Sequence, residues 1–449
     1  MKDSELIALA GDIQRGANPA RPNETTDYDP LLRSIGDARF VLIGEASHGT
    51  HEFYRERAEI TKRLIAEYGF SAVAVEADFP DAYRINSYVR AAGKDQNAIE
   101  CLEGFKRFPA WMWRNADVLD FVGWLRAYND DLPNGYQKIG FYGLDLYSLH
   151  TSINVVLNYL EKIDPDGAAR ARERYSCFEH FGEDTQSYGY ATAFGIAESC
   201  ENEVVSQLTE LNRRATELAN LDGRVAADEF FIVEMNARLV KNAEQYYRTM
   251  YRSNVSSWNL RDRHMVETLV SLEKHLSGDN KPAKVVVWEH NSHLGDARAT
   301  EMSHRGEWNV GQLVREKYGN EAYLIGFTTY NGTVTAARNW GDEAERRRVR
   351  NALDGSIEAL FHGLDYDRFY LTFNNNEALR AKLRMPMLER AIGVIYRPET
   401  ERQSHYFQTR LSEQFDAVIH IDETRALEPL ERTAEWERGE PAETFPFAV

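Results

Sequence analysis

The fold is indicated first by residues 40–52, FVLIGEASHGTHE, where a short apolar run ends in glycine, a carboxylate and histidines. Such a run, bounded by glycine or charge, is typical of a strand buried on both faces in a parallel sheet. Residues 51–68 then carry their apolar side chains at helical spacing, and a second apolar run follows at residues 72–75. This order of strand, helix and strand predicts a βαβ unit of an α/β fold.

More apolar runs of the same kind extend the expected sheet, at residues 139–142, 285–288, 323–326, 368–373, 391–396 and 417–421. Between residues 151 and 276, strand signals give way to helical periodicity, as in Trp258, Met265, Leu269, Leu272 and Leu276. We therefore expect a parallel-sheet core with helices on both faces and a large helical insertion. The expected parts are residues 1–150 (first part of the α/β core), 151–276 (helical insertion over the cleft) and 277–449 (second part of the core).

The charge balance limits the classes of partner. The chain of 449 residues has 53 Lys and Arg against 71 Asp and Glu, a formal charge of −18. An acidic protein lacks the basic surface that nucleic acids and anionic membranes require. The one basic run, residues 346–350, follows two glutamates and is interpreted as a solvated helix face. No apolar run reaches the 18 or so residues of a membrane span.

Three cysteines, Cys101, Cys177 and Cys200, are far apart and form no CxxC pair. This sparse, odd number favours a reducing compartment and predicts neither a disulfide framework nor a thiolate zinc site. The acidic N-terminal residues do not resemble a signal peptide. The expected location is the cytoplasm, and the sequence leaves the oligomeric state open.

Groups capable of acid–base chemistry follow four of the expected strands. They are Glu45 and His48 after the first strand, Glu76 after the second, Asp145 after the third, and His290 and His293 after the fourth. Because parallel strands end at one edge of the sheet, where open α/β folds bind ligands, we expect these side chains to share one cleft.

Arg57 lies on the apolar stripe of the expected helix, four residues after Phe53 and three before Ile60. A cation on a buried stripe needs an anionic partner. Because it is one or two turns from the helix start, we expect Arg57 to lie near Glu45 and His48.

Two reaction classes fit such a cleft. The sequence has no Gly-x-Ser-x-Gly elbow, no phosphate-binding P-loop and no Gly-x-Gly-x-x-Gly fingerprint. One class is attack by water that a histidine activates as general base. The other is a metal centre, because the His-x-x-His pairs 48/51 and 290/293 with nearby carboxylates can bind zinc or manganese. The residues alone leave both classes open.

The motifs at these positions resemble the erythromycin esterase family. They are Gly44-Glu45-x-x-His48-Gly49-x-x-Glu52-Phe53, Arg57, Glu76, Phe108-Pro109-x-Trp111-Met112-Trp113-Arg114-Asn115, Gly143-Leu144-Asp145, Trp258-Asn259-x-Arg261-Asp262 and Trp288-x-His290-Asn291-x-His293. The resemblance spans about residues 30 to 425. It implies a metal-independent hydrolase without cofactor that opens a lactone with histidine-activated water. It further implies His48 as the general base, with Glu45, Arg57, Glu76 and His290 as the other essential polar residues.

The expected partner is a small-molecule lactone or ester, and a macrolide-like substrate is one candidate. Trp111 and Trp113 either line an apolar wall for this substrate or belong to the core. With Asp145 and His293 they are our candidates for substrate contact. Two other hypotheses remain: a metal-dependent hydrolase or metal-binding protein that uses the same cleft, and a protein associated with polysaccharide biosynthesis.

Overall fold

The computed structural model describes residues 3–214, 224–278, 281–374 and 376–439. Its centre is an eight-stranded sheet in the order β1-β9-β12-β6-β2-β5-β3-β4. Neighbouring strands from β12 to β4 run parallel, whereas β9 is antiparallel to β12 and β1 to β9. The strands are β1 Asn18–Pro19, β2 Phe40–Ile43, β3 Ala72–Asp78, β4 Gly140–Asp145, β5 Val285–Trp288, β6 Ala322–Thr328, β9 Arg368–Thr372 and β12 Ala417–Ile421.

Two further sheets lie in the C-terminal part. One pairs β10 (Met387–Arg390) with β11 (Tyr406–Thr409), and the other has the order β13-β7-β8, with β13 Glu423–Thr424, β7 Asn331–Ala336 and β8 Glu345–Val349. The segment 391–396, expected as a strand, makes only isolated bridges to Ser47 and Ala337, so that prediction is wrong.

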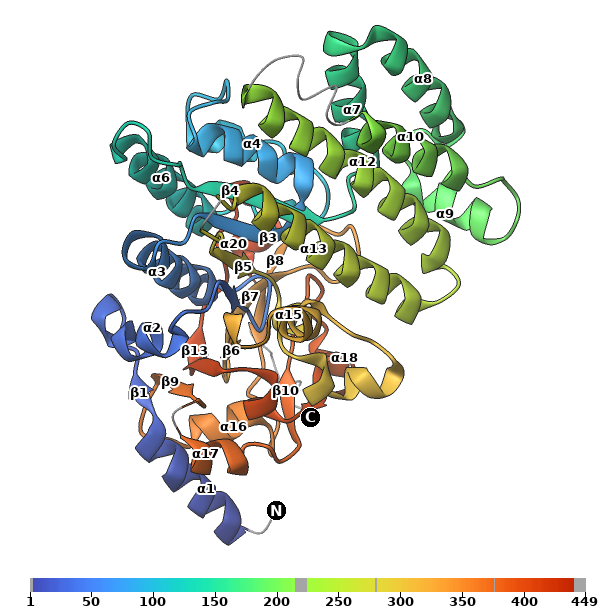
Figure 1. The fold of residues 1–449 in the computed structure, drawn as a ribbon. Helices are drawn as coiled ribbons and strands as arrows, with labels where there is room; N and C mark the ends of the chain where they lie inside the picture. Colours follow the sequence, from blue (N-terminus) through green and yellow to red (C-terminus); the bar gives the residue numbers. More distant parts are fainter. Residues whose placement is uncertain (1–2, 215–223, 279–280, 375, 440–449) are drawn as a thin grey trace.

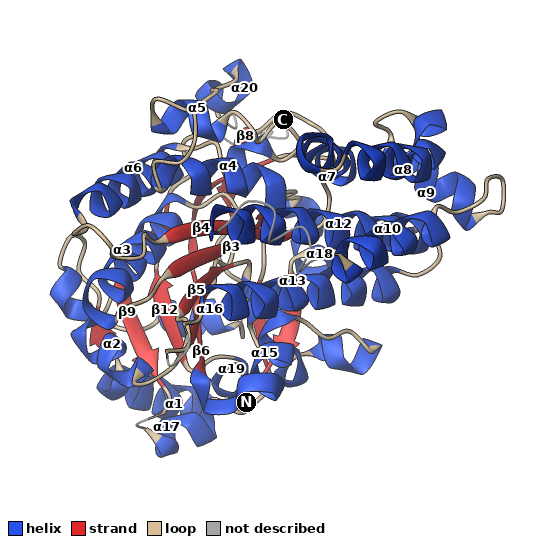
Figure 2. Cartoon of the chain, turned by 45° about the horizontal axis from the view of Figure 1, so that its top comes forward, coloured by secondary structure: helices blue, strands red, loops and turns tan. Residues whose placement is uncertain are grey.

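Helices cover both faces of the central sheet, which runs between them in Figure 2. Before the insertion they are α1 Asp3–Gly16, α2 Asp29–Ile35, α3 His51–Tyr68, α4 Phe79–Val89, α5 Ala98–Leu102 and α6 Ala116–Asp131. After it they are α14 Asn291–Leu294, α15 Val310–Tyr318, α16 Ile357–His362, α17 Glu377–Lys382, α18 Glu401–Ser404, α19 Leu411–Gln414 and α20 Ala434–Arg438. Short 3₁₀ turns are η1 Thr25–Tyr28, η2 Ala110–Met112, η3 Ser176–Phe181, η4 Ala297–Ala299, η5 Glu301–Arg305, η6 Gly319–Glu321 and η7 Pro398–Thr400. The expected α/β class, with helices on both faces of a mostly parallel sheet, is confirmed.

Helices also fill the segment between β4 and β5, and they gather on one side of the molecule in Figure 1. They are α7 Leu149–Ile163, α8 Pro165–Tyr175, α9 Thr185–Ala193, α10 Glu201–Arg213, α12 Arg224–Met250 and α13 Asn254–Leu276. The last of them, α13, packs against β4 and α15. Met265, Leu269 and Leu272 of its apolar stripe are fully buried. The division of the chain into three parts, with the insertion as a cover, stays a prediction.

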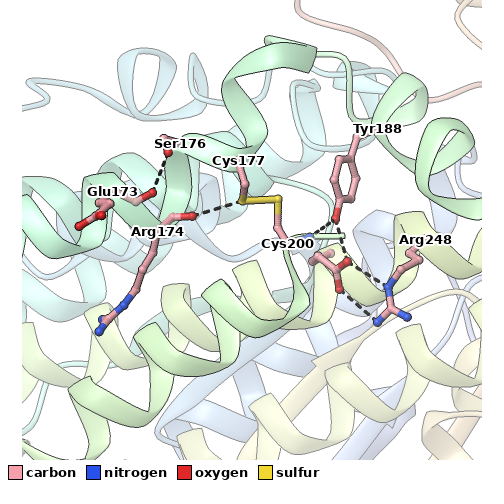
Figure 3. Close-up of a disulfide and its surroundings, with 8 residues drawn as sticks. Glu173, Arg174, Ser176, Cys177, Tyr188, Cys200 and Arg248 are labelled. Atoms are coloured by element: carbon pink, nitrogen blue, oxygen red, sulfur yellow. Dashed lines mark hydrogen bonds and ion pairs between the residues drawn. A yellow bond between two sulfur atoms is a disulfide. The ribbon is translucent and has the colours of Figure 1, made fainter. Parts of the chain in front are cut away.

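A disulfide joins Cys177 in η3 to Cys200 at the start of α10, with the Cα atoms 6.0 Å apart (Figure 3). The expectation that the cysteines stay unpaired is therefore wrong for these two, and Cys101 is a buried thiol. The cause is tertiary. Tyr188 of α9 packs against Phe178 of η3, accepts a hydrogen bond from the backbone amide of Cys200 and donates one to Glu244 of α12. This bond removes the cysteine argument for a reducing compartment, and the cytoplasmic location stays a prediction.

The basic run 346–350 is also different from expectation. It forms strand β8 rather than a helix face, paired antiparallel with β7. Arg347 is buried within it while Arg348 is exposed, as strand alternation requires. In the part of the chain that the structure describes, no helix is both long and apolar enough to cross a bilayer.

Candidate active site

Four strand ends meet at a cavity of about 350 Å³, as predicted from the sequence. It lies where β2, β3, β4 and β5, which are neighbours in the sheet, finish at their carboxyl ends. The lining includes His48, Glu76, Asp145, His290 and His293, so five of the predicted site residues face one space. This edge of the sheet is where the fold places ligands.

His48 is held by Glu45. The Nδ1 atom of His48 is 2.8 Å from Oε1 of Glu45, and both side chains are more than nine-tenths buried. A carboxylate only accepts, so Nδ1 carries the proton and Nε2 keeps its lone pair. The second hydrogen-bonding atom of the ring is therefore available to the cavity that His48 lines.

The backbone after β2 is fixed by close packing. A Cβ atom on Gly49 would lie 1.8 Å from the carbonyl oxygen of Thr335, and one on Gly44 would lie 2.1 Å from Oδ1 of Asn291. Only glycine allows these approaches. The amide of His48 also donates to the carbonyl of Ile392 (3.3 Å), which holds the loop against the segment that was expected to be a strand.

Arg57 has the anionic partner that its position on α3 predicts. Its Nη2 atom is 3.0 Å from Oε2 of Glu45, and the guanidinium lies over the rings of Tyr54 and Trp288 at 4.6 and 4.8 Å. Arg57 is 1% exposed and does not line the cavity. It therefore contacts Glu45 rather than a ligand in the cavity.

His290 lies next to His48, with the ring centroids 4.8 Å apart. The backbone amide of Ser292 donates to its Nδ1, so the neutral ring carries its proton on Nε2. Among the described residues, Nε2 of His290 has no hydrogen-bond partner. Burial, together with the nearby His48, lowers the pKa of His290 to about 3. A neutral N–H donor thus lies beside the proposed base.

Glu76 connects the strand ends to α13. It accepts hydrogen bonds from Nη2 of Arg261 (2.7 Å) and from the backbone amide of His290 (2.9 Å). Burial opposes its ionisation, but His293 and Arg261 hold the pKa of Glu76 well below its usual value. The carboxylate is therefore charged and fixes the position of the His290 backbone.

Asp145 and His293 complete the same network. Arg261 donates to Asp145 from Nε (3.0 Å) and Nη2 (2.7 Å), and from Nη1 to Nε2 of His293 (3.0 Å). The other ring nitrogen of His293 donates to Asp262 (2.9 Å), so both nitrogens are engaged. A guanidinium at Nε2 would repel a cation there. Within the described ranges, no group of three or more His, Cys, Asp or Glu side chains has an arrangement that fits a metal ion.

Aromatic side chains form the rest of the cavity wall. Trp113 lines the cavity, whereas Trp111 does not, although both belong to the same buried cluster. Phe108 and Trp340 meet edge to face at 5.0 Å, and Trp258 stacks on His293 at 4.3 Å. The position of Trp113 fits substrate contact and that of Trp111 fits a core residue, and the contact itself stays a prediction.

Several lining residues were missed as candidates. Arg261 occupies the stripe of α13 three residues after Trp258 and four before Met265, so the reasoning that singled out Arg57 also applies to it. Arg107, which pairs with Asp78 at 3.1 Å, and the exposed Trp340 come from loops that carry no such periodic signal.

Known proteins resemble this chain over nearly its whole length. The sequence profile described as erythromycin esterase matches residues 65–424. Erythromycin esterase type II of Escherichia coli is 21% identical over 90% of this chain and 93% of its own, and putative hydrolase YbfO of Bacillus subtilis is 22% identical over 91% and 90%.

Solved structures show the same fold. A succinoglycan biosynthesis protein superimposes with a TM-score of 0.76 at 23% identity, covering 95% of this chain and all of that one. A mutant of erythromycin esterase EreC in its open conformation gives 0.63 at 18% identity, covering 91% and 96%. The extent of the profile match decides the relationship: this chain belongs to the erythromycin esterase family.

Proposed function

We propose that this protein hydrolyses a lactone or ester by direct attack of a water molecule that His48 activates. Membership of the erythromycin esterase family implies a hydrolase that acts on esters. The observation that carries the mechanism is the pairing of His48 with Glu45, which leaves Nε2 of His48 as a base beside the cavity. A positioned general base of this kind contributes about 10²–10⁴-fold to a rate.

The reaction begins with water held near Nε2 of His48. The ring takes one proton, the oxygen forms a bond to the carbonyl carbon, and the carbonyl π electrons move onto oxygen. The N–H at Nε2 of His290 is the neighbouring donor for this oxyanion. When the tetrahedral intermediate collapses, the C–O bond to the alcohol breaks and the protonated His48 returns its proton to the leaving oxygen. The products are a carboxylic acid and an alcohol.

Glu45 and Arg57 support this step without touching the substrate. Glu45 fixes the Nδ1–H tautomer and stabilises the imidazolium that forms. Arg57 holds the second oxygen of Glu45 and so sets the direction of its carboxylate. Both are positioning residues in this proposal, as is Glu76 through the backbone of His290.

The substrate, we propose, has a large apolar face. Trp113, Trp258, Phe108 and Trp340 surround a cavity of about 350 Å³, near the lower end of the range for small-molecule sites. A macrolide-like lactone is the candidate that the names of the relatives suggest. Helix α13 already contributes Trp258, and the insertion is proposed to cover the bound substrate.

Mass spectrometry of a panel of macrolides, simpler lactones and esters tests this function. Incubation with the wild-type chain should add one water to at least one of them. His48→Asn should reduce the rate at least about 10²-fold, while His304→Asn, at an exposed histidine outside the cavity, should keep full activity.

Chelation separates the histidine base from a metal mechanism. Activity of the wild-type chain should survive exhaustive EDTA treatment. Activity that is lost with EDTA and returns with zinc or manganese would refute the histidine base. An inactive wild-type chain across the whole panel would refute ester hydrolysis.

A further inference from the structure

A second hollow, of about 420 Å³, lies next to the reaction cavity. Asp78, Asp81, Arg107 and Tyr147 line both, so they form the common wall between the two spaces. Arg107 is fixed in this wall, because its Nη2 atom is 3.1 Å from Oδ2 of Asp78 and its guanidinium lies over the ring of Tyr147 at 4.5 Å. The hollow is therefore a neighbouring compartment of the reaction cavity rather than a separate surface site.

The second hollow lies between the α/β core and the helical insertion. The core contributes the end of β3, the start of α4 and residues of the loop 104–107. The insertion contributes the first residues of α7 and the start of α9. A molecule bound in the hollow would therefore contact both parts of the chain.

The linings of the two compartments differ in their chemistry. Aromatic rings form much of the wall of the reaction cavity, whereas hydroxyl, amide and imidazole groups line the second hollow. These groups belong to Ser148, His150, Thr151, Asn154 and Thr185. Burial lowers the pKa of His150, so its ring is neutral near pH 7 and both donates and accepts hydrogen bonds.

The charges of the described lining do not favour an anion. Its carboxylates are Asp78, Asp81 and Glu183, and its cations are Lys106 and Arg107. Asp78 and Arg107 pair with each other, which leaves no excess of positive charge. A ligand with several hydroxyl groups suits a lining that offers both donors and acceptors, because each hydroxyl donates and accepts.

Ser148 supplies an independent observation that points to a ligand. It is 8% exposed and borders the hollow, and its Oγ atom has no hydrogen-bond partner among the described residues. It precedes α7, yet its side chain makes no capping hydrogen bond to that helix. Buried polar atoms are rarely left without a partner. The hydroxyl is therefore available to a group that enters the hollow.

We propose that the second hollow is a substrate subsite, which binds a neutral, hydroxyl-rich substituent while the ester or lactone lies in the reaction cavity. The inference rests on the proposed hydrolysis, because it extends the same site. Ser148 would bond one hydroxyl of the substituent, and Asn154 and Thr185 would bond others. The reaction cavity alone, of about 350 Å³, is near the lower end of the range for small-molecule sites, and the second compartment allows a larger substrate.

Two esters that differ in one substituent test the subsite. They are 4-nitrophenyl hexanoate and the same ester with a glucosyl group on the terminal carbon of its acyl chain. In the wild-type chain, the KM for the glucosyl ester should be at least about fivefold lower, because hydrogen bonds to the substituent add to binding.

Removing the hydroxyl of Ser148 separates binding from folding. Ser148→Ala should raise the KM for the glucosyl ester at least about threefold more than the KM for the plain ester. The kcat for the glucosyl ester should not follow this change, since the lost contact is remote from the reacting carbonyl. The melting temperature should not fall, because the removed Oγ has no partner among the described residues.

Two asparagines of α7 allow a matched steric test. Asn154 and Asn158 are both exposed and lie four residues apart on this helix, and Asn154 borders the hollow whereas Asn158 does not. Asn154→Trp should raise the KM for the glucosyl ester about tenfold relative to that for the plain ester, as the loss of one or two hydrogen bonds predicts. Asn158→Trp should behave as the wild type does with both esters.

The outcomes distinguish the subsite from the reaction itself. Equal KM values for the two esters in the wild-type chain would overturn the subsite while ester hydrolysis stands. An unchanged KM for the glucosyl ester in both Ser148→Ala and Asn154→Trp would do the same. A lower KM for an ester that ends in an ammonium group would overturn the assignment of a neutral ligand. A wild-type chain that cleaves neither ester would contradict the proposed function, and the subsite with it.

Discussion

Replacing Arg57 by methionine tests the buried arrangement beneath the site. The guanidinium is 1% exposed and Glu45 is 2% exposed, with Nη2 and Oε2 3.0 Å apart. Methionine keeps the length of the aliphatic part of the side chain but removes the guanidinium. The Glu45 carboxylate then keeps its hydrogen bond with His48 and loses the charged partner. Removing one member of a buried ion pair costs about 3–5 kcal/mol.

The expected shift in melting temperature follows from chain length. Unfolding entropy of about 2.1 cal/mol/K per residue gives a chain of 449 residues a shift of about 1 °C for each kcal/mol. Arg57→Met should therefore melt about 3–5 °C below the wild type. Adding Glu45→Gln removes the unpaired charge, so the double variant should be more stable than the sum of the two single effects predicts.

Urea denaturation followed by tryptophan fluorescence measures the double-mutant cycle, and lactone hydrolysis measures function. Both single variants and the double variant should lose activity, because His48 loses its oriented carboxylate. Arg55→Met is the control on the same helix, since Arg55 bonds Asn23 near the surface. Equal stability of Arg57→Met and Arg55→Met, or strict additivity in the cycle, would refute the reasoning.

Three further predictions concern pH, the disulfide and the loop after β2. The pKa of His290 is about 3 in the folded chain and 6.5 in the unfolded chain, so the unfolded state binds the proton more readily. The contribution of the neutral ring to stability is therefore complete above pH 6.5 and is lost as the pH falls from 6.5 toward 3. Between pH 7 and pH 5, urea denaturation should show the wild type losing about 2 kcal/mol more than His290→Asn; equal losses would contradict the assignment. The disulfide closes a loop with a sequence separation of 23 residues, so Cys177→Ser/Cys200→Ser should lower the free energy of unfolding by about 3 kcal/mol, measured by a thermal melt. Reductant should lower the stability of the wild type by the same amount and leave that variant unchanged. Gly49→Ala should abolish most hydrolysis, because its Cβ would clash with Thr335. The control is Gly123→Ala in α6, where space around the Cβ is open, and it should keep activity and stabilise the helix by about 1 kcal/mol. An active Gly49→Ala enzyme would show that the loop is not fixed.

Sequence predicted the parts of the fold that burial dictates. The runs at β2 and β5 are apolar throughout because both sheet faces are covered, and their bounds match the structure. The run 391–396 has similar composition but meets the 46–48 loop and Ala337 only at single bridges. Its backbone partners are loops far along the chain, and composition does not reveal them.

Buried charge misled the interpretation of β8. Strand alternation places Arg347 inside and Arg348 outside, but a buried arginine hides the period of two that would mark a strand. The site was predictable where chemistry follows strands, as for Glu45, His48, Glu76 and His290. Arg107, Trp340 and the disulfide depend on how loops and insertion helices pack, which spacing along one sequence does not specify.

The position of β2 in the sheet has a consequence for biosynthesis. This strand leaves the ribosome early, yet its neighbours are β5 and β6, made more than 240 residues later. At about 5–20 residues per second, both edges of Phe40–Ile43 wait roughly 10–50 s for their partners. An apolar strand with two open edges invites pairing with other nascent chains. The yield of folded protein should therefore depend on chaperones that shield this segment during translation, more than on the stability of the finished molecule.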